Sequence, residues 1–310
     1  MKNVTVIIPN YNHAAYLEQR IQSVLKQSYQ DFELILLDDS STDSSIEVIE
    51  KYREHEKTAH VFLNQKNSGT PFGLWKTAVE MASGKYIWIA ESDDWASEDF
   101  LLNLVSVLEN SDAVMAHSNS FFYINDQYKL NDWWDSFQSK RWNSDYIEDG
   151  SKLLEEYGRY KCPVINVSSA LIKKEVLKND FYPVNFRYSG DWWFWTNVFR
   201  TGKVAFISKP LNTIRVHNQS VTQNNKGINI IKLKEDVRII NEINKQLNIK
   251  LKYDPNYDWL IDLWLSVFKN NGKYFSFENH IVELHYTFKI AFYKRYFPFI
   301  FNKIIAKLTK

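Results

Sequence analysis

The feature that most constrains the fold of this chain is an apolar run that ends directly in acidic residues. Residues 87–95 read I-W-I-A-E-S-D-D-W, so a strand-like segment is followed directly by Glu91, Asp93 and Asp94. Open α/β sheets bind ligands at the carboxyl ends of their strands. Clustered carboxylates there suit Mg²⁺ or Mn²⁺, which bind together with substrate phosphates. The alternative is an ordinary helix start capped by Ser97, but a helix cap does not explain acids placed directly after the strand.

Strand-like and helix-like segments alternate through residues 1–117. The expected strands are 4–8, 32–37, 61–63, 86–90 and 113–116, and the expected helices are 16–26, 44–53, 74–82 and 100–108. Repeated βαβ units predict an α/β fold with a Rossmann-like, mostly parallel sheet and helices on both faces. Residues 118–225 include a strand at 164–172 and complete this domain. Residues 226–310 form a helical C-terminal extension.

Composition narrows the class of protein. The chain has 310 residues, of which 45% are hydrophobic and 24% charged, values typical of globular proteins. The net charge of +1 gives no basic surplus, so we expect no nucleic-acid partner. Cys162 is the only cysteine, and the chain shows neither a signal peptide nor an apolar run of 18 residues. These features favour a cytoplasmic protein.

Loops at the other strand ends carry candidates for nucleotide binding. Tyr11, in P-N-Y-N-H, is free to stack on a flat ring. Asp38 or Asp39, in L-D-D-S, can accept hydrogen bonds from a base or ribose. A third loop, K-N-S-G-T, supplies a cation at Lys66 and flexibility at Gly69. Each loop taken alone also reads as an ordinary turn. The glycine motifs of dinucleotide and P-loop sites are absent, which leaves a nucleotide held by acids and a metal.

Together these segments resemble the nucleotide-sugar half of the family 2 glycosyltransferases, which have the GT-A fold. The matching segments are V-T-V-I-I-P-N-Y-N, S-V-L-K-Q-S-Y-Q-D-F-E-L-I-L-L-D-D-S-S-T-D, K-N-S-G, A-S-G-K-Y-I-W-I-A-E-S-D-D and D-W-W-F-W. The resemblance implies a nucleotide-sugar donor, expected to be a UDP-sugar. It places the donor on Pro9, Tyr11, Asn12, Asp38, Asp39, Lys66, Gly69, Lys76, Ser92 and Asp93.

The resemblance also implies an Mn²⁺ or Mg²⁺ site. Family members carry an acidic cluster, often D-x-D-D, that here reads E-S-D-D with Glu91 in place of the first Asp. We therefore assign the metal to Asp93 and Asp94 and leave the part of Glu91 open. The segment L-N-T-I-R-V-H resembles the R-x-H ending of the family. It implies that Arg215 lies near the diphosphate and that His217 is a third metal ligand.

One further departure from the family pattern and one further match to it concern the diphosphate and the acceptor. Many members carry Arg-Asn where this chain has Trp75-Lys76, so Lys76 either replaces the lost cation near the diphosphate or packs as an ordinary helix lysine. In the D-W-W-F-W segment, the resemblance implies that Asp191 is the catalytic base. It also implies that Trp192, Trp193 and Trp195 shape the acceptor pocket. The alternative is that Asp191 only caps a helix.

The C-terminal extension carries no recognisable catalytic motif. Residues 286–310 contain six Lys or Arg, no acid, and many aromatic residues. Such a segment can lie on an anionic membrane surface, which would place the protein peripherally on the inner face of the cell membrane. Alternatively, its apolar face packs on the catalytic domain or on a second subunit, as in a homodimer.

We therefore expect a metal-dependent inverting glycosyltransferase acting on a glycan or lipid-linked acceptor in cell-surface polysaccharide synthesis. Two other functions stay open. One is a metal-dependent phosphoryl-transfer enzyme that uses the acids near Asp38 and Asp93. The other is a non-catalytic glycan-binding protein on a GT-A fold, which the Glu91 and Trp75 departures would favour.

Overall fold

The computed structural model describes residues 2–217, 230–270 and 284–308. The strands are β1 (Val4–Asn10), β2 (Phe32–Asp38), β3 (Thr58–Leu63), β4 (Tyr86–Ile89), β5 (Trp95–Ala96), β6 (Ala113–Ile124), β7 (Gln127–Leu130), β8 (Tyr146–Asp149), β9 (Ala170–Lys173) and β10 (Lys203–Arg215). The α-helices are α1 (Ala14–Leu25), α2 (Ser45–Glu50), α3 (Pro71–Met81), α4 (Phe100–Glu109), α5 (Gly150–Leu153), α6 (Gly190–Phe199), α8 (Ile230–Gln246), α9 (Asp258–Asn270) and α10 (Tyr286–Leu308).

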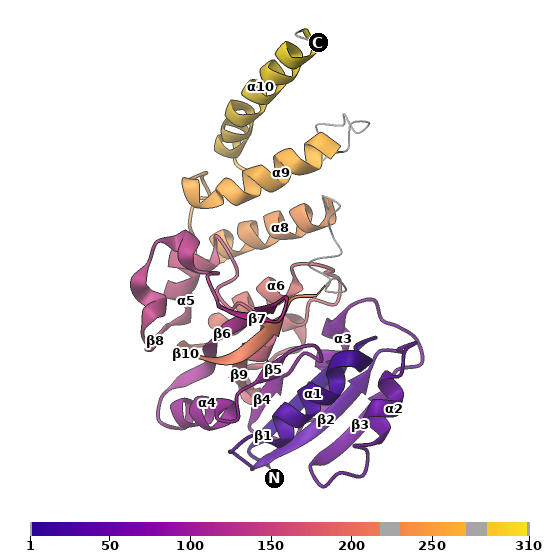
Figure 1. Ribbon diagram of the computed structural model, residues 1–310. Coiled ribbons are helices and arrows are strands. Elements are labelled where there is room, and N and C mark those ends of the chain that lie inside the picture. The colour runs from indigo at the N-terminus through magenta and orange to yellow at the C-terminus, as the bar shows by residue number, and fades with distance from the viewer. Residues whose placement is uncertain (1, 218–229, 271–283, 309–310) are drawn as a thin grey trace.

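The described strands form one central sheet (Figure 1). Its order is β3-β2-β1-β4-β9-β6-β10-β5, with β7 paired to β6 and β8 paired to β10. Strands β3, β2, β1 and β4 run parallel, and β6 runs parallel to β10. Strand β9 lies between β4 and β6 and is antiparallel to both, so β6 points the same way as β4. The predicted mostly parallel α/β sheet is confirmed.

Helices cover both faces of the sheet, as the sequence predicts. In β1, Ile7 packs in a core with α3, α6 and α8, whereas Val6 and Ile8 pack in a second core with α1, α2 and α4. Alternate side chains of a strand point to opposite faces. A strand buried on both faces therefore reads as a continuous apolar run, which is how β1, β2 and β4 appear in the sequence.

The strand expected over residues 4–8 continues through Pro9 to Asn10 as β1. Its pairing with β4 stops at Ile7, whereas its pairing with β2 reaches Asn10. The Asn10 carbonyl accepts a hydrogen bond from the following β2 segment, at Asp39. Neighbouring residues of a strand point their N–H groups to opposite sides, so Pro9 faces the side where pairing has ended. Its missing N–H is therefore tolerated.

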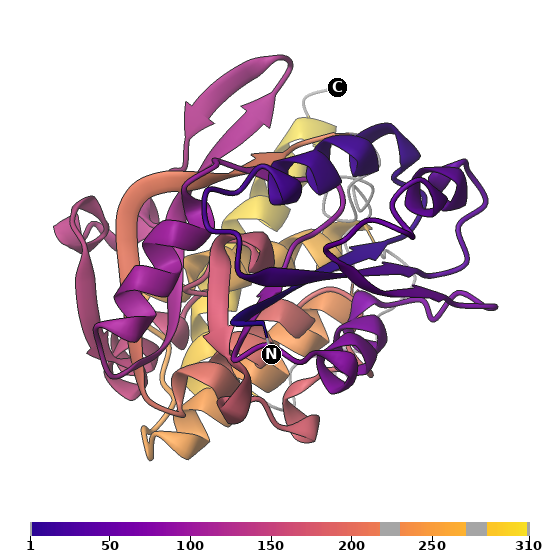
Figure 2. The ribbon, with the colours of Figure 1, turned by 90° about the horizontal axis from the view of Figure 1, so that it is seen from below.

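Two segments differ more strongly from expectation. Strand β6 continues to Ile124 and turns into β7, and in Figure 2 this magenta hairpin projects from the body. Strands β7 and β8, at positions where the sequence predicts no strand, both extend the sheet. The strand expected over 164–172 is shortened to β9, because residues Val167–Ser169 form a 3₁₀ turn before it.

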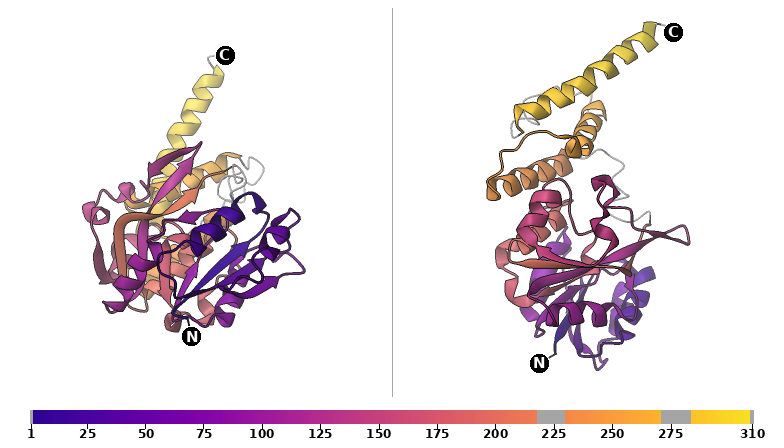
Figure 3. Two further views of the ribbon diagram at one scale, coloured as in Figure 1. Left: turned by 60° about the horizontal axis from the view of Figure 1, so that its bottom comes forward. Right: turned by 90° about the vertical axis from the view of Figure 1, so that its left-hand side faces the viewer.

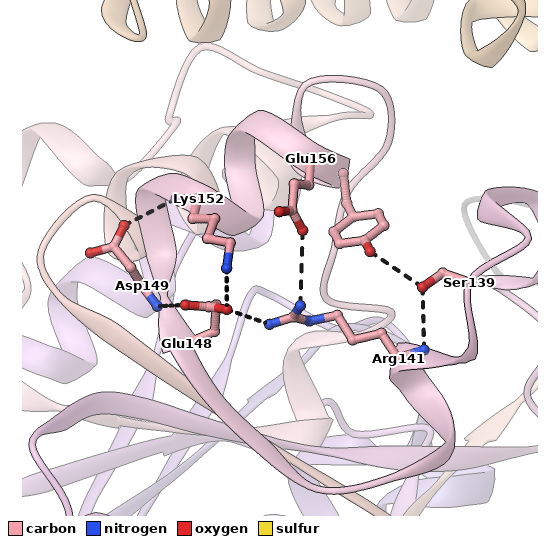
Figure 4. A network of polar contacts seen from close by, with 7 residues as sticks. Ser139, Arg141, Glu148, Asp149, Lys152 and Glu156 are labelled. Carbon is pink, nitrogen blue, oxygen red and sulfur yellow. Dashed lines mark hydrogen bonds and ion pairs between the residues drawn. The ribbon is translucent and has the colours of Figure 1, made fainter.

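Ion pairs stiffen the connection between β8 and α5 (Figure 4). Glu148 lies 3.0 Å from Arg141 and 2.8 Å from Lys152, and Arg141 also lies 3.9 Å from Glu156. Asp149 caps α5 by accepting the Lys152 N–H at 3.0 Å. These contacts hold a polar, exposed segment against the edge of the sheet at β10.

The C-terminal helices stack on one side of the α/β body, with α10 farthest from it (Figure 3). Helix α8 shares a core with α6, in which Leu233, Val237 and Ile240 join Phe194 and Trp195. Helical periodicity in the sequence predicts α8 and α9, and both are present. Among the described helices, none has the length and apolar character needed to cross a membrane.

Candidate functional site

Polar residues gather where β1, β2 and β4 end. These three strands are neighbours in the sheet, so their carboxyl ends meet at one edge. Asp38 and the segment Glu91–Asp94 lie there, as the sequence predicts, and Asn10, which was not predicted, lies beside them. The end of β10 brings Arg215 to the same place, because its backbone N–H donates to Asp94 Oδ1 at 3.1 Å.

The two acids that follow β2 organise loops. Asp38 is fully buried and accepts hydrogen bonds from Asn10 Nδ2 at 2.8 Å and from the Ser41 N–H and hydroxyl at 2.7 and 2.6 Å. The expectation that the Asp38 side chain itself contacts a nucleotide is therefore wrong, because it has no exposed surface. Asp39 keeps 4% of its surface exposed and accepts from Ser68 N–H and hydroxyl groups.

The remaining residues assigned to the donor have different surroundings. Tyr11 is 45% exposed, so its ring is available for stacking. Asn12 adopts a left-handed backbone with φ 55°, and its Oδ1 accepts the Thr42 N–H at 2.7 Å, which joins the β1 and β2 loops. Pro9 is buried within β1. Lys66 and Gly69 are exposed in the loop before α3, Gly69 with φ 77°, and Lys76 is half-buried on α3.

Three side chains form a candidate metal site among the described residues: His13, Asp93 and His217. Each offers one ligand atom, and these atoms lie within 4.8 Å of one another. The assignment of Asp93 and His217 to a common site agrees with this geometry, and His217 Nε2 lies 3.0 Å from Asp93 Oδ2. Asp94 is not a member of this cluster. Its Oδ1 accepts the Arg215 N–H, and its Oδ2 is buried with no close hydrogen-bond donor among the described residues.

His13 was not identified from the sequence. It is the residue before α1, directly after the P-N-Y-N turn, and a histidine beside a strand end was the available signal. Its Nδ1 lies 2.8 Å from the hydroxyl of Ser92, a contact that fixes the orientation of the ring. Burial lowers the pKa of His13, so the imidazole is neutral at neutral pH, the form that binds metals.

The charges of the cluster suit a cation. Burial would raise the pKa of Asp93, but the hydrogen bond from His217 and the charges of His13 and His217 together outweigh it and lower that pKa. Burial raises the pKa of Asp94 to about 7, and the charge of Asp93 adds to this effect. The cluster therefore combines the ionised Asp93 carboxylate with the neutral His13 ring and the His217 imidazole. Such a set of oxygen and imidazole ligands fits a divalent cation.

A buried arginine, Arg20, contacts the acidic segment. Arg20, on α1, has no exposed surface, and its Nε donates to the Glu91 carbonyl at 2.8 Å. Burial lowers the pKa of Arg20 to about 10, and the charges of Asp94, Asp93 and Glu91 oppose that fall. Arg20 lies three residues after Leu17 on the buried stripe of α1. A charged residue on an apolar stripe is the sequence signal that would have found it.

Glu91 behaves differently from the acid that it replaces. Burial, followed by the charges of Asp93 and Asp94, raises the pKa of Glu91 to about 8, so this side chain is mainly protonated at neutral pH. Its Oε1 has no hydrogen-bond partner among the described residues. The charge of Asp191 also raises the pKa of Glu91, so Asp191 lies within electrostatic reach of Glu91.

Arg215 holds the acidic loop in place. Its Nε donates to the Asp93 carbonyl at 3.0 Å, and its Nη2 donates to Gln19. The guanidinium lies over the rings of Tyr16 at 4.7 Å and Trp95 at 4.5 Å. A contact between Arg215 and a diphosphate stays a prediction, as does the role of Lys76.

The residues assigned to the acceptor separate into two groups. Asp191 is the second residue of α6, and its Oδ1 accepts the Trp192 N–H at 2.8 Å. Burial raises the pKa of Asp191. Trp192 and Trp195 are 4% and 0% exposed in the hydrophobic core, so the expectation that their rings line an acceptor pocket is wrong. Trp193 is half-buried and stacks on Phe186, with ring centroids 5.5 Å apart.

Comparisons with known proteins agree with this architecture. An uncharacterised glycosyltransferase of Haemophilus influenzae is 39% identical over 122 residues, which cover 39% of this chain and 48% of the relative. The chain thus spans about half the length of that relative. A Campylobacter jejuni protein named GalNAc(5)-diNAcBac-PP-undecaprenol beta-1,3-glucosyltransferase is 25% identical over 227 residues, covering 72% of this chain and 68% of the relative.

The fold is shared with a solved structure. S. aureus TarS 1–349 in complex with UDP-GlcNAc superposes with a TM-score of 0.64 at 21% identity, over 91% of this chain and 77% of TarS 1–349. A family model describes residues 5–211, from β1 into β10, and thus includes the acidic cluster and Asp191. Because this match covers more than half of the sequence, the chain belongs to glycosyl transferase family 2.

Proposed function

We propose that this protein transfers a sugar, with inversion, from a nucleotide-sugar donor to a hydroxyl group of an acceptor, using a divalent cation. The observation that carries the proposal is the cluster of His13, Asp93 and His217 at the strand ends, with Asp191 within electrostatic reach of Glu91. Family membership supports the reaction class. A metal site at a sheet edge, together with a separate half-buried carboxylate on α6, suits group transfer from a diphosphate.

Each part of the cluster has a chemical role in the proposal. The cation, held by His13, Asp93 and His217, would neutralise charge on the leaving diphosphate. Asp191 accepts the proton of the attacking hydroxyl. Because burial raises its pKa, Asp191 is a stronger base than an exposed aspartate. Attack by the hydroxyl on the face opposite the diphosphate inverts the sugar.

The donor is proposed to be a UDP-sugar. TarS, which has the same fold, is described in complex with UDP-GlcNAc, and this supports the nucleotide assignment. Tyr11 has an exposed ring for stacking on the base, and Asp39 with Asn12 shapes the loops beside it. Lys66, at the exposed tip of the neighbouring loop, supplies a cation for the phosphates.

The acceptor is proposed to be a glycan carried on a lipid. The name of the Campylobacter jejuni relative contains a polyprenyl-linked acceptor, which supports this class. Helix α10 exposes Tyr286, Ile290 and Phe297 at 64%, 48% and 63%, together with Lys294. These residues recur at three- and four-residue spacing and share one face. Apolar and basic side chains on one helix face suit an anionic membrane surface.

The donor experiment measures melting temperature against a panel of nucleotide sugars, each with Mn²⁺ or Mg²⁺. A UDP-sugar should raise it by mass action, and EDTA should abolish the rise. Asp93→Asn should lose the rise, whereas Asp112→Asn, an exposed acid paired with Lys203, should keep it. Binding that survives EDTA and Asp93→Asn would contradict the metal role. Release of inorganic phosphate from phosphoesters would instead support the phosphoryl-transfer alternative.

The membrane experiment measures co-sedimentation with anionic liposomes at low salt. Phe288 and Phe292 of α10 are fully buried, so truncating the helix would expose the core, and point variants are preferable. Replacing Ile290 and Phe297 by Ser should weaken binding without changing donor affinity. Leu102→Ser, at a 49% exposed position on α4, is the matched control. Dissociation of a dimer by the double variant, with no liposome binding by the parent, would favour the subunit alternative.

A further inference from the structure

A carboxylate of α8 holds the segment that leads into α6. Glu235 accepts hydrogen bonds from three successive backbone N–H groups: Arg187 at 2.7 Å, Tyr188 at 2.9 Å and Ser189 at 2.9 Å. Glu235 is only 9% exposed, so its charge is largely removed from water. Three N–H donors offset that desolvation, because hydrogen bonds to an ionised carboxylate are about twice as strong as neutral ones.

The next residue of α8 fixes the same segment through a side chain. Asp236 is fully buried, and its Oδ1 accepts the Ser189 hydroxyl at 2.5 Å. Its other oxygen pairs with Lys232 at 2.6 Å. Ser189 is the residue before α6, and its hydroxyl donates to Asp236 instead of capping the helix. The start of α6 thus depends on α8, about 45 residues later in the chain.

The segment is also tightly packed at Gly190. An added Cβ at Gly190 would lie 2.3 Å from the ring of Phe72 and 2.8 Å from Pro183, distances at which something must move. Glu235 holds the backbone of residues 187–189, and Phe72 leaves no room for a side chain at Gly190. Asp191 follows Gly190 directly, so the position of its carboxylate is set by this packing.

We propose that Glu235 and Asp236 are positioning residues, which hold Asp191 where it can accept the proton of the acceptor hydroxyl. The inference rests on the proposed role of Asp191 as base. In this proposal α8 positions a catalytic residue of the transferase site, in addition to packing within the C-terminal extension. A shift of about 1 Å in a catalytic group can cost about a hundredfold in rate, so loss of either anchor should act on turnover.

Charges from several elements face Asp191, and they offer a second readout. Lys232 lowers and Asp236 raises the pKa of Asp191, after the larger effect of burial. Glu91, after β4, and Cys162, before β9, also lie within the electrostatic reach of Asp191. Asp236→Asn keeps an oxygen to accept the Ser189 hydroxyl but removes one negative charge. The acid limb of the kcat–pH profile should therefore move to lower pH.

The main experiment compares Glu235→Gln with Glu242→Gln, which makes the same charge change on α8 at a residue bonded only locally, to Gln246. Glu235→Gln should raise hydrogen exchange of the amides at 187–189. It should lower kcat at least about tenfold, while Kd for UDP with Mn²⁺ stays within about twofold. Glu242→Gln should change neither. Unchanged exchange and a kcat near that of the parent in folded Glu235→Gln would overturn the inference.

Two further variants keep the outcomes distinct. If Glu235→Gln fails to fold, the pH profile of Asp236→Asn decides, and an acid limb that does not move rejects the proposal. Asp191→Asn is measured in the same assay. If it transfers sugar normally, the proposed function has failed. If it is inactive while Glu235→Gln and Asp236→Asn behave like the parent, only the positioning inference has failed.

Discussion

Replacing Asp191 by Asn separates a catalytic role from a structural one. Asn has nearly the same shape, and its carbonyl oxygen can still accept the Trp192 N–H that Asp191 Oδ1 accepts at 2.8 Å. The amide cannot take up a proton at neutral pH. The substitution therefore removes the proposed base while leaving the first turn of α6 nearly intact.

The magnitudes follow from the position of the side chain. Asp191 lies in the first turn of α6, where a negative charge contributes about 0.3–1 kcal/mol. Burial already disfavours that charge, so we expect stability to change by less than about 1 kcal/mol, which is under about 4 °C in melting temperature. Loss of a general base costs about 10²–10⁴-fold in rate. At 1.36 kcal/mol per factor of ten, the barrier rises by about 2.7–5.4 kcal/mol.

The assay measures melting temperature, affinity for UDP with Mn²⁺, and kcat on one preparation of Asp191→Asn. We expect kcat to fall at least about a hundredfold with donor affinity unchanged. Asp149→Asn is the control, because Asp149 caps α5 by accepting the Lys152 N–H at 3.0 Å and is exposed. A folded Asp191→Asn protein with close to the parent kcat would refute the assignment.

Three other predictions concern single positions. His13→Ala should weaken Mn²⁺ binding at least about tenfold by calorimetry, and His60→Ala, on exposed β3, should not; equal affinity in both would remove His13 from the site. Gly190→Ala should destabilise by about 1–3 kcal/mol in urea, because its Cβ would meet Phe72, whereas Gly73→Ala, with open space, should stabilise slightly. Burial lowers the pKa of His117 to about 3, so below about pH 6.5 the unfolded chain takes up a proton that the folded chain does not. The free energy of unfolding should therefore decrease as the pH is lowered, by about 2 kcal/mol between pH 7 and pH 5. His117→Phe should remove that loss in urea titrations at both pH values.

The order of strands and helices could be read from the sequence because both depend on local periodicity. Apolar runs buried on two faces gave β1, β2 and β4, and apolar spacing on one face gave α1 and α4. The acids after β4 lie at a strand end by covalent connection alone. The predicted ligand edge therefore needed no knowledge of tertiary contacts.

The ends of the strands were harder to predict from the sequence, because they depend on which strands pair with them. Strand β6 was expected to stop at Ala116 but extends to Ile124, because β10 and β7 hydrogen-bond to its second half. Strand β9 is short because β4 and β6 contact only its few residues on either side. The sequence motif alone carries no information about these partners.

The sequence by itself determined the fold family, the acidic strand end and the identity of Asp191 as a candidate base, because each depends on short segments whose order is fixed by the chain. Only the tertiary structure decided which side chains meet. The family resemblance already paired His217 with Asp93, 124 residues away, but only the folded chain shows that His13 joins them from the turn before α1. Burial then assigned roles that composition could not, since Asp38 and Trp195 lie inside the protein, whereas Tyr11 remains exposed.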